Sequence, residues 1–142
     1  MRYLGLDLGS KTLGISISDR TNTIASVYTT LRFENEDYDS LIIPLKKIIE
    51  ENNITNIILG LPINMNGSYG NRANISVEFK EKLENNLNIS VELMDERLTS
   101  VISNDVLIKA DVSRKKRKNK VDGMAAVVIL QNYLDKKGNG YE

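Results

Sequence analysis

The sequence predicts an α/β fold with a mixed five-stranded sheet, in which three antiparallel strands precede two parallel strands flanked by helices. Two observations predict it. Near the N-terminus, apolar residues alternate in residues 4–8 and 13–17, which is the period of a strand. Further along, segments with apolar residues at helical spacing lead into short runs rich in β-branched residues, the pattern of helix-connected parallel strands.

The first two strands are predicted to form a β-hairpin with a turn at residues 9–12. In the first strand, leucines occupy one face, and Gly5 and Asp7 occupy the other. Aspartate is depleted in strands, and burying its charge without a partner is costly. We therefore expect a partner that compensates the negative charge of Asp7, and a metal ion is one candidate.

The other elements follow in chain order. Right-handed crossovers make the fourth and fifth strands parallel to the first, and ligand sites of such sheets gather at the carboxyl ends of the parallel strands. Asp7 and Glu96 both fall at or just past such ends. The expected elements are a third strand at 24–31, a helix from Asp39 or Ser40 to about 52, a strand at 54–59, a loop at 60–70, a helix capped by Asn71 or Asn74, a strand at 89–94, a helix capped by Thr99 or Ser100, and a last helix at 121–135.

Length and composition narrow the class of protein. The 142 residues suit one domain, predicted at 1–136, with a flexible C-terminal tail at 137–142. Histidine and cysteine are both absent, which excludes Ser-His-Asp and Cys-His catalysis and His-ligated zinc. No segment resembles a signal peptide or a membrane span, so we expect a soluble cytoplasmic protein with no membrane partner.

Three carboxylates form the candidate catalytic site: Asp7, Glu96 and Asp122. Asp122 is expected in the first turn of the last helix, where the following Ala125 and Ala126 allow close packing on the sheet. Three carboxylates around one point repel each other unless a divalent cation neutralises them, and oxygen ligands suit Mg²⁺ or Mn²⁺. Two such ions about 4 Å apart activate water for phosphodiester hydrolysis. Taken singly, each acid also has a purely structural interpretation. Asp7 would cap a turn, Glu96 would pair with Arg97, and Asp122 would lie at a helix N-terminus, where the helix dipole favours an acid.

A dense basic run precedes Asp122, although the 19 basic and 19 acidic residues of the whole chain balance. Such a run is commonly only a solvated surface, but its position next to Asp122 favours contact with a phosphate backbone. The hairpin turn offers Lys11 as a further cation, a weak signal because many hairpins carry Gly and Lys. The run, expected between the last two helices, comprises Arg114, Lys115, Lys116, Arg117, Lys118 and Lys120.

Five blocks resemble the YqgF/RuvX family, whose members are described as Holliday junction resolvases and as pre-16S rRNA nucleases. The resemblance covers nearly the whole chain and implies an RNase H-like fold with a carboxylate metal site made by Asp7, Glu96 and Asp122. It also implies that Arg97 contacts phosphate or orients Glu96. The blocks are GLDLGSKTLGISISD, GLPINMNGSYG, DERLTS, ADVSRKKRKNKVD and AAVVILQNYL.

The sequence departs from the family pattern at three places. Thr12 follows Lys11 where the family commonly has arginine, Asn66 replaces an aspartate, and Gly123-Met124 replaces Lys-Leu. None of these changes removes a candidate catalytic acid. The first removes a possible phosphate contact, and the second puts in doubt any role of that aspartate.

Residues and resemblance together predict a metal-dependent endonuclease that acts on structured RNA, in 5′-end maturation of pre-16S rRNA. Its partners would be nucleic acid and pre-ribosomal particles, and it would be a monomer or a homodimer. An alternative is a Holliday junction resolvase that cuts branched DNA with the same site. An alternative of another class is a non-catalytic RNA-binding module that keeps the acids for folding. An actin-like ATPase is disfavoured because that architecture needs a second domain.

Overall fold

The computed structural model describes residues 2–34, 36–95 and 114–138, with the side chains of 114–123 outside the description. Its sheet has the strand order β3-β2-β1-β4-β5, antiparallel across β1, β2 and β3 and parallel across β1, β4 and β5. This confirms the predicted mixed sheet. The elements are β1 (Arg2–Leu8), β2 (Thr12–Ser18), β3 (Ala25–Arg32), a 3₁₀ turn η1 (Tyr38–Leu41), α1 (Ile42–Asn52), β4 (Ile54–Leu61), α2 (Asn71–Leu87), β5 (Ser90–Asp95) and α4 (Arg114–Gly138).

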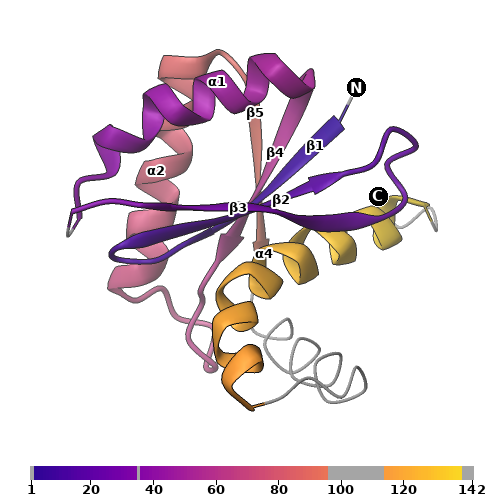
Figure 1. Cartoon of the computed structure of the whole chain (residues 1–142). Coiled ribbons are helices and arrows are strands. Elements are labelled where there is room, and N and C mark those ends of the chain that lie inside the picture. Colours follow the sequence, from indigo (N-terminus) through magenta and orange to yellow (C-terminus); the bar gives the residue numbers. More distant parts are fainter. Residues whose placement is uncertain (1, 35, 96–113, 139–142) are drawn as a thin grey trace.

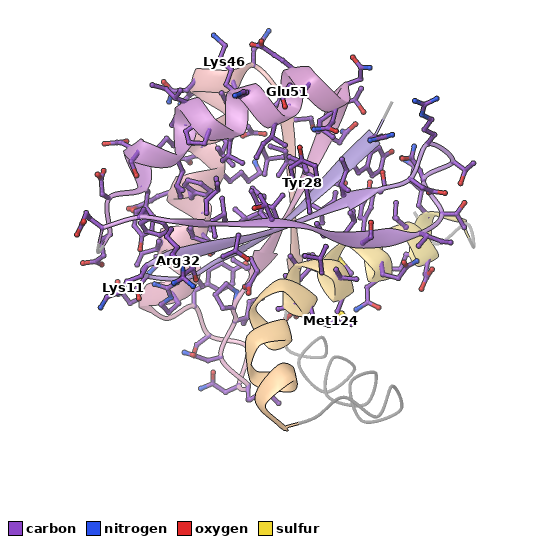
Figure 2. All side chains as sticks on the ribbon, in the orientation of Figure 1. Lys11, Tyr28, Arg32, Lys46, Glu51 and Met124 are labelled. Carbon is purple, nitrogen blue, oxygen red and sulfur yellow. The ribbon has the colours of Figure 1, made fainter. Side chains whose placement is uncertain are left out.

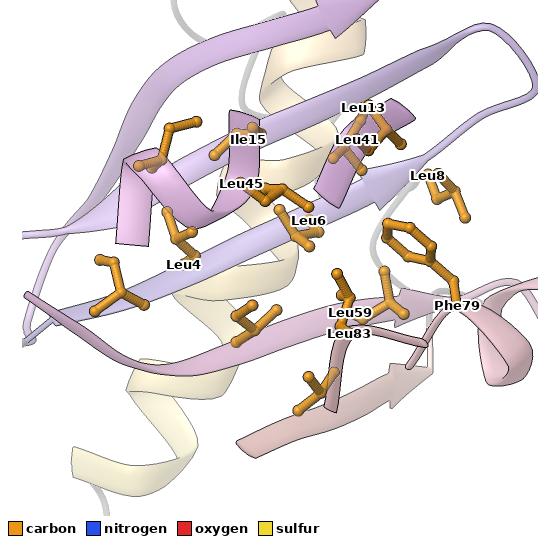
Figure 3. Close-up of a cluster of buried hydrophobic side chains, with 14 of the residues drawn as sticks. Leu4, Leu6, Leu8, Leu13, Ile15, Leu41, Leu45, Leu59, Phe79 and Leu83 are labelled. Carbon is orange, nitrogen blue, oxygen red and sulfur yellow. The ribbon is translucent and has the colours of Figure 1, made fainter. Parts of the chain in front are cut away.

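Helices cover both faces of the sheet: α1 and α2 lie on one face and α4 on the other (Figure 1). The larger core lies under α1 and α2 and includes Leu4 and Leu6 of β1 and Phe79 of α2 (Figure 3). A smaller core lies under α4 and joins Ile58 of β4 to Leu130. The period-2 pattern of β1 thus sends its leucines to one core and leaves Gly5 and Asp7 on the α4 face.

Asparagines end both helices of the first layer. Asn53 after α1 and Asn88 after α2 adopt left-handed backbone conformations, with φ of 54° and 51°. Asparagine tolerates this conformation better than most residues, so it stops a helix without glycine. The starts of the helices differ from the prediction: a 3₁₀ turn precedes α1, and Gly70, not Asn71 or Asn74, is the N-cap of α2.

The last helix is longer than predicted at both ends. It begins at Arg114 instead of Val121, so the backbone of the basic run is helical and does not form a connecting loop. Lysine and arginine are good helix formers, which explains the added turns. Lys137 and Gly138, expected in the flexible tail, are the last residues of the helix.

The expected helix after Thr99 or Ser100 lies outside the described residues. In the described part of the chain, no helix is long and apolar enough to cross a membrane.

Asp19 closes the turn between β2 and β3. Its carboxylate accepts hydrogen bonds from the Thr21 hydroxyl at 2.6 Å and from the backbone N–H groups of Thr23 and Ile24 at 2.8 and 3.1 Å. These bonds, that of Thr21 first, lower the pKa of Asp19 to about 2. Because the folded-state pKa lies below the unfolded value, the ionised group stabilises the fold above about pH 4 and loses this effect as pH falls toward 2.

We expect Asp19→Ala to lower stability at pH 7, because the turn loses three hydrogen bonds. Urea unfolding of the variant and the parent protein at a series of pH values checks this. The difference between them should shrink from pH 4 downward as Asp19 of the parent is protonated. A difference that stays constant over this range would contradict the expectation.

Candidate active site

Asp7 lies one residue before the end of β1, on the α4 face, and its side chain is half-buried. Its neighbours on that face are glycines. Gly14 of β2 pairs with Asp7, and Gly60 of β4 follows Leu59, the partner of Leu6. With no side chain on either neighbouring position, backbone flanks the carboxylate, and glycine permits the close approach of another group. The structure thus places Asp7 at the carboxyl edge of the sheet, as predicted.

Helix α4 is fastened to the sheet at several points along β1. Near the start of β1, the Lys137 ammonium donates to the Tyr3 hydroxyl at 2.7 Å, and the Tyr3 and Tyr133 ring centroids are 5.7 Å apart. Two residues further along β1, Gly5 faces Ala126. The helix therefore runs antiparallel to β1, with its earlier residues toward the carboxyl end of the strand.

Two buried or half-buried polar side chains fix the position of α4. The Ser16 hydroxyl of β2, fully buried, donates to the carbonyl oxygen of Ala126 at 2.7 Å. Gln131 accepts from the Ala25 N–H at 2.8 Å and donates to the Thr23 carbonyl at 2.9 Å. Bonds to both β2 and the start of β3 leave α4 little freedom to slide across the sheet. Neither Ser16 nor Gln131 was predicted to have a role.

Arg72, in the first turn of α2, is a further residue of this edge that the sequence did not reveal. Its guanidinium Nη2 donates to the carbonyl oxygen of Leu8 at 2.8 Å, next to Asp7 in the chain. This bond ties the start of α2 to the end of β1. The available signal was topological: a helix that follows a parallel strand begins at the carboxyl edge of the sheet.

We expect Arg72→Ala to lower the free energy of unfolding by about 1–2 kcal/mol, because a charged hydrogen bond to a half-buried carbonyl is lost. Urea unfolding measures this directly. Arg72→Lys is the matched control, since it keeps the positive charge and loses the planar fork of donors. A stability of Arg72→Ala equal to that of the parent would show that the bond contributes nothing.

Lys11 lies in the turn of the β1–β2 hairpin, as predicted, and its side chain is exposed. Arg32, at the end of β3, pairs with Thr12, and the Phe33 N–H donates to the Lys11 carbonyl at 2.9 Å. The two cationic side chains lie near one another at this tip (Figure 2). Thr12 stands where the YqgF/RuvX family commonly has an arginine, so a possible phosphate contact is missing at that position. Arg32 provides a guanidinium on the neighbouring strand, directly across from Thr12. The sequence offered no signal for it, because strand register decides this pairing.

The other predicted site residues lie partly outside the description. Glu96 and Arg97 are outside the described residues. The backbones of Asp122 and of the predicted phosphate-binding residues 114–118 belong to α4, and their side chains are not described. Among the described side chains, no group of three acids, histidines or cysteines could hold a metal ion. Of the three candidate acids, Asp7 is the one whose side chain the structure describes.

Comparison with solved structures identifies the class of fold. Thermus thermophilus RuvC in complex with a Holliday junction substrate matches with a TM-score of 0.67 and 9% identity, over 99% of this chain and 97% of that chain. The fowlpox virus Holliday junction resolvase matches with a TM-score of 0.59 and 16% identity, over 96% and 99%. At these identities the likeness concerns the fold, which is the RNase H-like fold of RuvC-type resolvases.

Sequence comparison identifies the family. The pattern of the family described as "RuvX: Holliday junction resolvase" matches residues 1–136. A relative from Oceanobacillus iheyensis is 46% identical over 96% of this chain and 100% of its own length, and one from Bacillus subtilis is 47% identical over 95% and 98%. Both are named "Putative pre-16S rRNA nuclease". The chain belongs to the RuvX family, a family of nucleases.

Proposed function

We propose that this chain is a metal-dependent endonuclease that hydrolyses a phosphodiester bond of structured RNA, in the 5′-end maturation of pre-16S rRNA in the cytoplasm. The observation that carries the proposal is the course of α4 along β1. Tyr3 meets the last turns of α4, and Gly5 meets Ala126. The next step of two strand residues, to Asp7, leads toward the helical turn before Ala126. That turn contains Asp122, which supports a site shared by Asp7 and Asp122.

Strand periodicity supports Glu96 as the third acid. Met94 of β5 packs with the core under α4, and it pairs with Gly60 of β4. Side chains alternate along a strand, so we predict Glu96 on the same face, at the same edge as Asp7. Strands β1 and β5 have β4 between them and are therefore about 10 Å apart. Two carboxylates, one from each strand end, and an ion between them can bridge this distance.

The donor set fits Mg²⁺ or Mn²⁺. Carboxylate oxygens of Asp7, Glu96 and Asp122 would hold the ion, and the described Asp7 has glycine neighbours that leave room for it. When bound, such an ion stabilises negative charge on the reacting phosphate. The chain's own cations would hold the substrate backbone, through contacts that are independent of sequence and weaken as salt rises. These cations are Lys11, Arg97, Arg114, Lys115, Lys116, Arg117 and Lys118.

A cleavage assay on a transcript that spans the mature 5′ end of 16S rRNA tests the proposal. We expect cutting with Mg²⁺ or Mn²⁺, none with EDTA, and loss of cutting in Glu96→Gln and Asp122→Asn. The matched control is Asp95→Asn, which changes a carboxylate on the opposite face of the same strand end. Cutting that survives both acid substitutions would overturn the site.

A second candidate function is cleavage of four-way DNA junctions, which the fold shared with RuvC-type resolvases favours. Competition between the RNA transcript and a four-way junction decides between the two substrates. A resolvase would prefer the junction and act as a homodimer that cuts paired strands. If the chain is instead a non-catalytic RNA-binding module, the parent chain and Asp7→Asn should bind the transcript with equal affinity. Neither of them should then cut either substrate.

A further inference from the structure

The loop between β4 and α2, residues 62–70, exposes two large apolar side chains. Met65 is 81% exposed and Tyr69 is 53% exposed. The loop contains no charged residue, so it offers no cation for a phosphate. Exposed aromatic and thioether groups on an uncharged loop suit a flat apolar ligand better than an anion.

Hydrogen bonds within the loop hold its shape. The Asn64 N–H donates to the Ser68 carbonyl at 3.0 Å, and the Gly67 N–H donates to the Asn64 carbonyl at 2.8 Å. The Asn66 side-chain oxygen accepts from the Ser68 N–H at 3.0 Å and from its hydroxyl at 2.6 Å. An aspartate could accept the same two bonds, so the departure at Asn66 preserves the shape of the loop. A loop ordered in advance loses less conformational entropy on binding.

The 62–70 loop borders the edge that carries Asp7. It leaves β4 at Leu61, the carboxyl end of that strand. It enters α2, whose Arg72 is bonded to the carbonyl of Leu8. In Figure 1 the loop and the first turns of α4 extend beyond the sheet at the same end of the molecule. A nucleic acid strand with its phosphate at Asp7 would therefore pass near this loop.

We propose that the 62–70 loop binds an unpaired nucleobase of the substrate, which stacks on Tyr69 and contacts Met65. This inference rests on the proposed nuclease function and names its substrate class: a single-stranded segment next to the cut. Every base has a face that can stack, so stacking on Tyr69 does not select a sequence. That face is accessible only where the base is outside a duplex, so stacking selects unpaired nucleotides. The absence of charge in the loop fits an arrangement in which the loop binds a base and the cations Lys11 and Arg32 bind the phosphates.

Binding without cleavage tests the loop. The probes are a single-stranded RNA oligonucleotide that carries one 2-aminopurine and the same oligonucleotide in a duplex, each titrated with the full chain in EDTA. We expect Tyr69→Ala to weaken single-strand binding by roughly 5- to 100-fold and to reduce the quenching of 2-aminopurine. Duplex binding should change little. Tyr69→Phe should bind as the parent does, and Tyr28→Ala, which truncates an exposed tyrosine on β3, is the matched control.

Unchanged single-strand binding by Tyr69→Ala would overturn the proposal. This is also the result expected if the loop binds a protein partner and not a nucleobase. An equal loss on single strand and duplex would also overturn it. Thermal unfolding of each variant separates a binding defect from a folding defect. The readout needs no cleavage, so a failure of the nuclease site would leave this result standing, and a failure of stacking would leave the cleavage result standing.

Discussion

Asp7→Asn is expected to reduce metal-dependent cleavage on the order of 10³-fold or more while the fold stays intact. Asparagine has nearly the shape of aspartate and keeps one acceptor oxygen, but it loses the charge that would hold a cation. The half-buried side chain has glycine at its neighbouring positions on the α4 face, so the substitution creates no steric conflict. The effect on the cleavage rate should therefore be larger than any effect on stability.

Single-turnover cleavage with saturating enzyme measures the rate, and calorimetric titration with Mn²⁺ measures metal binding. Asp95→Asn, at the same edge and on the other face, should keep both within a few-fold of the parent. Equal cleavage by Asp7→Asn and the parent would remove Asp7 from the mechanism. Normal Mn²⁺ binding with lost cleavage would give Asp7 a role other than holding the ion.

The sequence predicted those parts of the fold that depend on local pattern. Alternating leucines in residues 4–8 located β1 and the face that carries Asp7, and both follow from the strand period alone. The order of strands and helices then fixed the mixed sheet through the handedness of its crossovers. These signals lie within short stretches of chain, which is why they can be read without a structure.

The parts that were missed depend on contacts between distant segments. Arg72 reaches the Leu8 carbonyl across 64 residues, and Ser16 reaches the Ala126 carbonyl across 110. Such bonds form only once the sheet and its helices are packed together. Neither residue spacing nor composition encodes them.

Strand register is a second source of what was missed. Arg32 lies opposite Thr12 because of the register of β2 against β3, which a bulge shifts within the pair. The alternation of side chains locates a strand but does not determine which residues of its neighbour lie across from it. For the same reason, the meeting of Glu96 and Asp122 with Asp7 stays a prediction, since it depends on how three separate elements pack.

Gly5→Ala is expected to lower the free energy of unfolding by about 3 kcal/mol, or the melting temperature by roughly 10 °C. A β-carbon at this position would lie 2.8 Å from the carbonyl oxygen of Ala126 and 2.7 Å from the β-carbon of Leu130. Both atoms belong to or adjoin the backbone of α4, so neither can rotate away. The strand or the helix must shift. Urea and thermal unfolding measure the loss.

Gly9→Ala is the matched control, because its added β-carbon would lie 3.2 Å from the nearest atom, the Thr12 carbonyl oxygen. A small shift of this turn accommodates that contact, so the loss should stay below about 1 kcal/mol. Since α4 carries Asp122 and the basic run, moving the helix away from β1 should also slow cleavage at temperatures where Gly5→Ala remains folded. Full cleavage by folded Gly5→Ala would show that the site does not depend on how closely α4 packs against β1.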